Sequence, residues 1–244
     1  MRTIRLTLEY EGTDYVGWQL QPNGLSVQQV VEEALHKVMG EAVRLHSSGR
    51  TDARVHARCM VAHFRTGLNL PLAAFREGVN RFLPCDIAVR KAEEAPQGFH
   101  ARFDARGKWY RYTLYLNPVR SPLHARTSWH IRDHLDVAAM TEAVPLFVGL
   151  HDFAAFRTSG CAARCTEREI YSFEIIREGD LLHCDVRGSG FLRNMVRVMV
   201  GTLVEVGLGK RDVDSITSLL SGQSPHPSGM TAPPQGLCLM EVWY

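Results

Sequence analysis

The segment TIRLTLEY, residues 3–10, alternates apolar and polar side chains and therefore predicts a half-buried β-strand. The apolar face consists of Ile4, Leu6, Leu8 and Tyr10. Residues 26–40, SVQQVVEEALHKVMG, then follow the spacing of an amphipathic helix. Ser26 is its expected N-cap, Gln29 would complete a capping box, and Gly40 is its expected end. A strand followed, after the loop of residues 11–24, by such a helix favours a fold in which helices pack on a sheet.

The pattern continues through the first hundred residues. A short strand is expected at residues 43–46 and a longer one at residues 57–65, followed by a helix from Pro71 to Pro84 and a strand over DIAVRKAEE, residues 86–94. The resulting order, β-α-β-β-α-β, is that of a ferredoxin-like sheet with helices on one face.

A second half begins near residue 107 and repeats this arrangement without sequence identity. Strands are expected at residues 108–118, 168–176, 181–188 and 236–244, and helices at residues 135–149, 190–207 and 212–222, the first of them distorted by Pro145. The fold class is therefore α+β, with two similar ferredoxin-like or RNA-recognition-like halves, residues 1–106 and 107–244. Each half has a mostly antiparallel sheet, and a catalytic cleft is expected between the halves.

The composition is that of a globular chain with a weak positive charge. The 244 residues are 45% hydrophobic and carry a net charge of +2. Four of the 28 cationic residues are lysines and 24 are arginines. Arginine suits phosphate and stacks on rings, although a genome-wide codon bias explains the excess equally well. The charge thus permits a local nucleic-acid site without indicating one by itself.

Several classes of protein lack support in the sequence. The six cysteines, including Cys161 and Cys165, do not form a zinc set, and no signal peptide is evident. Reduced and mostly buried thiols in the cytoplasm are therefore expected. No run of 18 apolar residues predicts a membrane span. Nucleotide-binding, serine hydrolase and zinc protease motifs are missing, so we expect no cofactor and no metal.

The loop SSGRTDARVHA, residues 47–57, places one acid between two arginines. Neighbouring guanidinium groups such as those of Arg50 and Arg54 favour the ionised form of Asp52. An ionised carboxylate is a poor general acid but a suitable nucleophile, general base or cation stabiliser. The alternative is a surface Asx turn in which Asp52 pairs with Arg50.

Two further segments carry candidate residues. In KWYRYTLY, residues 108–115, Tyr110 and Tyr112 share one face, which suits either a packed core or a surface that stacks bases. Tyr112 is expected in the core. In residues 190–207, Arg193 and Arg197 lie one turn apart, and Arg197 interrupts an apolar stretch. An arginine there either reaches solvent or pairs with a carboxylate, and Asp52 needs such a partner.

Six segments resemble those of one known family, in the same order. They are GRTDARVHA (49–57), NRFLPCDIAV (80–89), FHARFDARGKWYRYTLY (99–115), HDFAAFR (151–157), GFLRNMVRVMVGTLVEVG (190–207) and TAPPQGLCLMEVWY (231–244). The family is that of tRNA pseudouridine synthase A, the TruA family, and the resemblance extends over essentially the whole chain from EYEGTDYVGWQ onward.

This resemblance implies a function and a set of roles. The function is the isomerisation of uridine to pseudouridine at positions 38, 39 and 40 of the tRNA anticodon stem-loop. Asp52 matches the catalytic aspartate, Tyr110 the tyrosine that stacks on the target base, and Arg197 the basic residue that pairs with the acid. Arg50 matches an arginine linked with RNA binding and base displacement. The resemblance also implies a homodimer that needs no cofactor.

One position departs from the family and two other functions stay open. The family commonly has glycine where this chain has Arg54; glycine adopts positive φ readily and arginine does not, so the loop geometry is in question at this point.

The first alternative function is a non-catalytic RNA-binding module. The second is a hydrolase with an aspartate nucleophile, acting on a small glycoside or phosphoester.

Overall fold

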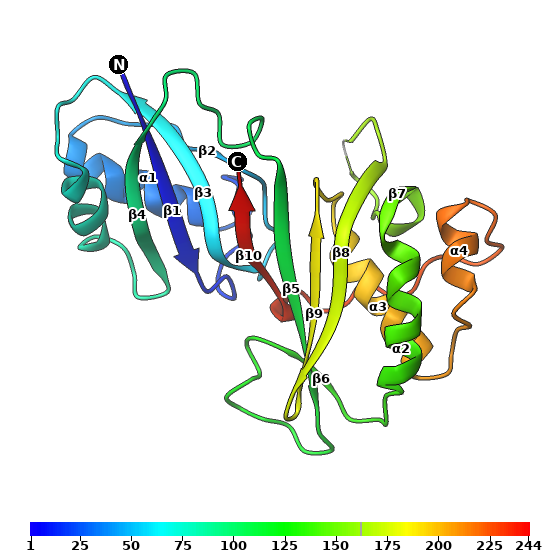
Figure 1. Ribbon diagram of the computed structural model, residues 1–244. Coiled ribbons are helices and arrows are strands. Elements are labelled where there is room, and N and C mark those ends of the chain that lie inside the picture. The colour runs from blue at the N-terminus through cyan, green and yellow to red at the C-terminus, as the bar shows by residue number, and fades with distance from the viewer. Residues whose placement is uncertain (162) are drawn as a thin grey trace. The chain divides into compact units, whose positions relative to one another are not determined.

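The structure, a computed structural model, describes residues 1–161 and 163–244 and shows a mixed α+β chain (Figure 1). It consists of two compact units, each of which contains five β-strands. The first unit contains Met1–Arg106 together with Cys238–Tyr244, and the second contains Gly107–Leu237.

The sheet of the first unit is built around β1 and β3. Its strands are β1 (Arg2–Tyr10), β2 (His46–Ser47), β3 (His56–Thr66), β4 (Ile87–Ala95) and β10 (Leu237–Trp243). β1 pairs antiparallel with both β3 and β4. β2 pairs antiparallel with β3, whereas β10 runs parallel to β3. Since a strand has two edges, β2 and β10 share the edge of β3 that lies opposite β1.

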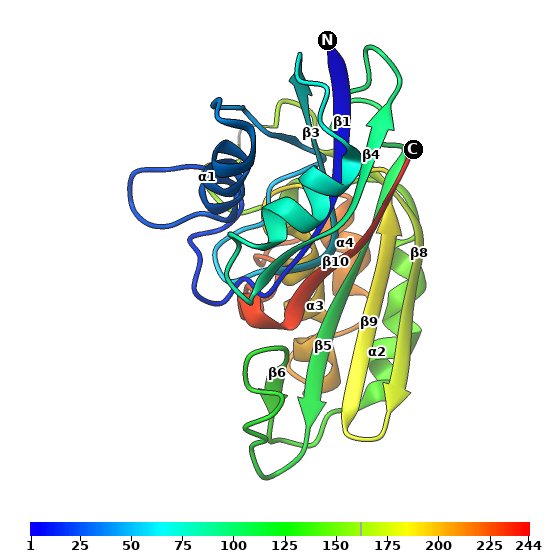
Figure 2. The same ribbon diagram turned by 90° about the vertical axis from the view of Figure 1, so that its left-hand side faces the viewer.

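The helix α1 (Val27–Met39) forms as its sequence predicts, with one difference at its start. Ser26 Oγ accepts a hydrogen bond from the Gln29 N–H at 3.2 Å, and Gly40 ends the helix with φ 72°. The Gln29 side chain donates instead to Glu33, at 2.9 Å, so only half of the predicted capping box forms. Figure 2 shows α1 and the helix of residues 72–80 on the same side of the sheet.

This second helix contains a π-helical turn, η1 (Ala74–Gly78). The wider turn is produced by an N–H of Val79 that donates to the Ala74 carbonyl, five residues back. Phe75 and Val79 of this helix are fully buried. After the helix, the Asn80 side chain hydrogen-bonds both the carbonyl and the N–H of Val89, at 2.9 and 2.8 Å, and thereby fixes the start of β4.

The sheet of the second unit is antiparallel apart from one short strand. Its strands are β5 (Gly107–Leu116), β6 (Trp129–Ile131), β7 (Gly149–Asp152), β8 (Glu167–Glu178) and β9 (Leu181–Gly188). β9 lies between β5 and β8, β7 pairs with β8, and β6 runs parallel to β5. The predicted hairpin of β8 and β9 is confirmed, with Glu178 opposite Leu181. β6 and β7 are too short to have left an alternating pattern.

The helices of this unit pack beside its sheet (Figure 2). They are α2 (Val137–Ala143), α3 (Met195–Gly207) and α4 (Ser215–Leu220), with 3-10 turns η2 (Val144–Phe147), η3 (Ala154–Phe156) and η4 (Pro234–Gly236). The predicted distortion at Pro145 is the change from α2 to η2. α3 is buried along most of its length, and a Cβ at Gly207 would lie 2.9 Å from Met140, so α2 and α3 are in close contact.

The last strand belongs with the first unit, although the sequence places it after the second half. In β10, Cys238 pairs with His56 and Leu239 with Ala57. Its end is held by the Arg106 N–H, which donates to the Trp243 carbonyl at 3.0 Å. Periodicity identifies the strand, but its partner is set by hydrogen bonds to residues almost two hundred positions away.

Other expectations concern the membrane and the thiols. Among the residues that the structure describes, no helix has the length and apolar character that a membrane span requires. All six cysteines are free thiols. The expectation that most of them are buried is wrong, because only Cys184 is fully buried and Cys85 and Cys165 are exposed.

Three histidines gather in the first unit, outside the segments that carry the candidate residues. The ring centroid of His63 lies 5.3 Å from that of His46 and 4.8 Å from that of His100. His63 Nδ1 lies 3.2 Å from the Ala101 nitrogen, from which it accepts in its unprotonated form, and 3.1 Å from the His46 carbonyl oxygen, to which it donates when protonated. Burial, and then the neighbouring His100 and His46, lowers the pKa of His63 to about 4.

We predict a loss of stability in mild acid that depends on His63. The unfolded chain protonates this histidine near pH 6.5, whereas the folded chain does so only near pH 4. As the pH falls between these values, the free energy of unfolding decreases by up to about 1.4 kcal/mol per pH unit. His63→Gln keeps an acceptor for Ala101 and does not titrate, so its urea-denaturation midpoint should change less over this range. Equal slopes for the variant and the wild type would contradict the assignment.

Candidate active site

Asp52 lies in the loop between β2 and β3, which we call the Asp52 loop (residues 49–55). Asp52 is half-buried, and Thr51 and Val55 beside it are buried. The Val55 N–H donates to the Asp52 carbonyl at 3.2 Å and closes a turn over residues 52–55. The Thr51 hydroxyl shares a 2.8 Å hydrogen bond with the Tyr10 hydroxyl. The backbone that carries the Asp52 carboxylate is therefore held by hydrogen bonds at Thr51 before it and at Val55 after it.

A second loop, the entry loop (residues 11–18), packs directly against the Asp52 loop. The Trp18 N–H donates to the Thr51 carbonyl at 3.1 Å, and the Arg54 N–H donates to the Tyr15 carbonyl at 3.2 Å. The Gly12 N–H donates to Nδ1 of the buried His56 at 2.9 Å. The two loops are thus joined by hydrogen bonds before, within and after the turn that carries Asp52.

Two glycines allow this close approach. A Cβ at Gly12 would lie 2.1 Å from the Val55 carbonyl oxygen. A Cβ at Gly17, where φ is +109°, would lie 2.6 Å from the Thr51 carbonyl oxygen. Both distances are far below van der Waals contact, so any side chain at these positions would push the Asp52 loop away. The sequence EGTDYVGW signals the contact through its two glycines, but its partner is not evident from the sequence.

The arginines beside Asp52 are exposed to solvent. Arg50 and Arg54 are both exposed, and within residues 1–161 and 163–244 neither guanidinium group makes a hydrogen bond or an ion pair. The surface turn with an Asp52–Arg50 pair is therefore not what the structure contains. Arg54 has φ 66°, so it retains the positive φ that a glycine would adopt there. The loop therefore keeps the geometry expected with a glycine at position 54, because Arg54 adopts the same positive φ despite the strain.

Tyr110 is held on β5 in the second unit. It lies opposite Val186 of β9 and is 8% exposed. Its ring packs edge-to-face with Phe191, at 5.2 Å between centroids. Tyr112, two residues on, is fully buried and donates to the Pro233 carbonyl at 2.7 Å, as the prediction of a core residue requires.

Arg197 lies on α3, where its half-buried side chain contacts both neighbouring loops. Nε donates to the Ala232 carbonyl at 2.7 Å, and Nη1 donates to Asn194 Oδ1 at 2.6 Å. Asn194 in turn donates to the Thr158 hydroxyl at 2.8 Å. Arg193 precedes α3, so the two arginines are not successive turns of one helix as predicted; its Nη1 donates to the Ser159 carbonyl.

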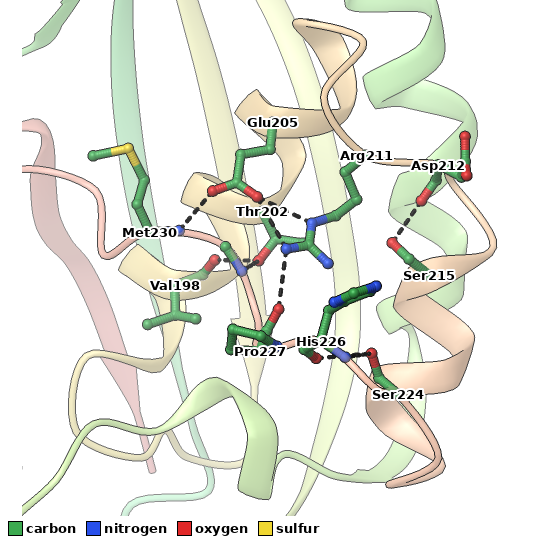
Figure 3. A network of polar contacts seen from close by, with 11 residues as sticks. Val198, Thr202, Glu205, Arg211, Asp212, Ser215, Ser224, His226, Pro227 and Met230 are labelled. Atoms are coloured by element: carbon green, nitrogen blue, oxygen red, sulfur yellow. Dashed lines mark hydrogen bonds and ion pairs between the residues drawn. The ribbon is translucent and has the colours of Figure 1, made fainter.

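Arg197 is one of several residues that hold a segment we call the return segment (residues 226–236) against α3. Figure 3 shows how α3 residues reach it. Glu205 accepts from the Met230 N–H at 2.9 Å, and Thr202 accepts from the Gly229 N–H at 3.0 Å. Arg211 joins Glu205 to the Pro227 carbonyl, at 3.0 Å to each. A Cβ at Gly201 would lie 1.8 Å from the Met230 oxygen, so the helix and the segment touch backbone to backbone.

Comparison with known proteins identifies the family. A family model described as tRNA pseudouridine synthase matches residues 7–104 and 143–244. The chain belongs to this family. It is similar to proteins named tRNA pseudouridine synthase A from Syntrophotalea carbinolica (64% identity, 100% of this chain and 97% of the relative), Pelobacter propionicus (59%, 100% and 100%) and Citrifermentans bemidjiense (58%, 100% and 98%).

The synthase is therefore an isomerase, which decides against both alternatives. A non-catalytic RNA-binding module and an aspartate-nucleophile hydrolase each fit single segments of the sequence, but neither accounts for a match to both halves of the chain. The matched ranges contain the Asp52 loop, α3 and the return segment, whereas Tyr110 lies between them.

We predict that the glycine contact sustains both stability and activity. Gly12→Ala should lower the free energy of unfolding by about 1–3 kcal/mol, the usual cost of overpacking, and should lower turnover because the Asp52 loop moves. Gly67→Ala is the matched control, since a Cβ there meets nothing within 4 Å and neither glycine has positive φ. Urea denaturation and a pseudouridine assay on both variants test this. A Gly12→Ala protein as stable and active as Gly67→Ala would contradict it.

Proposed function

We propose that this synthase converts uridines 38, 39 and 40 of the tRNA anticodon stem-loop to pseudouridine, with Asp52 as the nucleophile or base. The observation that carries the proposal is the fixed Asp52 loop. A carboxylate whose backbone is held by Gly12, Gly17 and Thr51 is positioned before the substrate arrives. We further propose that Asp52, Tyr110 and Arg197, drawn from two similar ferredoxin-like halves, act on the same uridine.

The reaction exchanges one bond for another and needs no redox partner. The bond between N1 of uracil and C1′ of the ribose breaks, the base turns, C5 bonds to C1′, and the proton of C5 is replaced by one on N1. Asp52 acts in one of two ways. It either attacks C1′ and is later displaced by C5, or removes the C2′ proton, which returns after C5 has added to the glycal.

The target base must leave its stack before this chemistry. Extrusion costs a few kcal/mol, and stacking on an aromatic ring returns about 1–3 kcal/mol. In our proposal Tyr110 provides that ring, oriented by its edge-to-face contact with Phe191. Arg50, exposed and without an ion pair in the described part of the chain, is available to occupy the space that the base vacates.

Arg197 and a second copy of the chain complete the proposal. The hydrogen bonds from Arg197 to Ala232 and Asn194 fix the direction of its guanidinium group, which we propose also stabilises the charge of Asp52. An anticodon stem-loop extends over tens of ångströms, more than a 27.4 kDa chain is expected to contact alone. We therefore propose a cytoplasmic homodimer whose two subunits share the tRNA.

Asp52→Asn is the direct test of the chemistry. The amide has the size of the carboxylate but is neither a nucleophile nor a base, so turnover should fall by at least about a hundredfold. Binding of tRNA should persist, because the backbone contacts of the loop do not involve the side chain. Tritium release from tRNA containing C5-tritiated uridine measures turnover, and filter binding measures the affinity for tRNA. Release within twofold of the wild type would remove Asp52 from the mechanism.

Two substitutions of Tyr110 separate its ring from its hydroxyl. Tyr110→Phe keeps the stacking surface and should retain most of the turnover, whereas Tyr110→Ala removes the surface and should lose about 1–3 kcal/mol of transition-state stabilisation. The same tritium assay applies. Equal losses in both variants would show that the hydroxyl, and not the stacking, is the essential feature.

A further inference from the structure

Arg54 has an unfavourable backbone conformation. Among the residues that the structure describes, only Arg54 and Asn194 combine a positive φ with a side chain. Asparagine tolerates this region because its short amide hydrogen-bonds locally, whereas an arginine gains nothing there and its Cβ is crowded by the carbonyl that follows. Arg54 is therefore the one residue in the described chain whose type disagrees with its conformation.

The surrounding loops prevent the strain from relaxing. The Arg54 N–H is bound to the Tyr15 carbonyl, and the turn is closed by the hydrogen bond from Val55 to Asp52. Gly12 and Gly17 press the entry loop against both sides of this turn. A glycine at position 54 would form the same turn without strain. The fold therefore has no use for the arginine side chain, and the reason for its presence lies outside the fold.

The guanidinium group is free to bind something. The side chain is exposed, and in the described part of the chain it makes no hydrogen bond or ion pair. It begins two residues from Asp52, in a turn whose backbone is hydrogen-bonded to the entry loop. A guanidinium group is always charged and presents a planar set of donors that matches the oxygens of a phosphate.

We propose that Arg54 is a substrate-positioning residue that binds a backbone phosphate of the RNA beside the uridine being isomerised. This inference rests on the proposed function, because it takes Asp52 as the reacting group. In this proposal the strained turn places the Arg54 guanidinium group near the RNA strand that carries the target uridine, close to the Asp52 carboxylate.

Arg54→Gly tests the inference because it acts on stability and on binding in opposite directions. Removing the strain should raise the melting temperature by about 2–4 °C. Removing one phosphate contact should weaken tRNA binding several-fold and should reduce the slope of log K against log salt concentration by about 1. The KM for an unmodified tRNA transcript should rise while kcat changes little. Arg54→Lys keeps the charge, so its salt slope should remain close to that of the wild type.

Arg81→Asn is the matched control, since Arg81 is exposed, lies in the same unit and, within the described residues, makes no ion pair. Its salt slope should equal that of the wild type. An unchanged salt slope for Arg54→Gly, or an equal reduction in Arg81→Asn, would overturn the inference. So would a lower melting temperature for Arg54→Gly, which would show that the arginine serves the fold. Undiminished turnover by Asp52→Asn would instead contradict the proposed function, whatever the salt slopes show.

Discussion

The close approach of two backbones at Gly12 and Gly17 is the constraint on which the active-site account depends. No side chain fits between the entry loop and the Asp52 loop, so the hydrogen bonds between them form directly from backbone to backbone. These hydrogen bonds hold the turn of residues 52–55, and the turn sets the position of the Asp52 backbone from which the carboxylate side chain extends. A catalytic group on a loop is usually less precisely held than one on a helix or strand. Here the glycines give a loop a rigidity that its length would not provide.

The second unit uses the same device. Gly201 brings α3 against the Met230 carbonyl, and the return segment is then tied down along its length by Arg211, Glu205, Thr202 and Arg197. Arg197 is therefore held in place by the return segment, which it in turn helps to hold against α3. The arginines to which we assign a role fall into two groups: Arg197 is held by hydrogen bonds to protein partners, whereas Arg50 and Arg54 are exposed.

The sequence predicts the elements that bury one face over many residues. The alternation of β1, the stripe of α1 and the apolar run of α3 each leave a periodic pattern, and each element forms. Short strands such as β6 and β7 leave none, because three or four residues do not establish a period. The position of β10 beside β3 depends on hydrogen bonds between distant residues, which no local pattern encodes.

The candidate site follows the same division. The motif around Asp52 is visible in the sequence because unusual residue types stand together. The contacts that hold it are not visible, since a glycine in EGTDYVGW could serve any turn. Arg197 was expected to need a carboxylate, and a backbone carbonyl and an amide oxygen are among its partners. A sequence shows that a buried cation requires acceptors, but the packing decides which acceptors lie within reach.

The central claim is that the fixed carboxylate of Asp52 performs an isomerisation in tRNA. The most direct measurement is a single-nucleotide map of pseudouridine in tRNA from cells that lack this gene and carry either the wild-type or the Asp52→Asn gene on a plasmid. The account predicts pseudouridine at positions 38, 39 and 40 with the wild-type gene and its absence with the variant. Equal modification at these positions in both strains would contradict it.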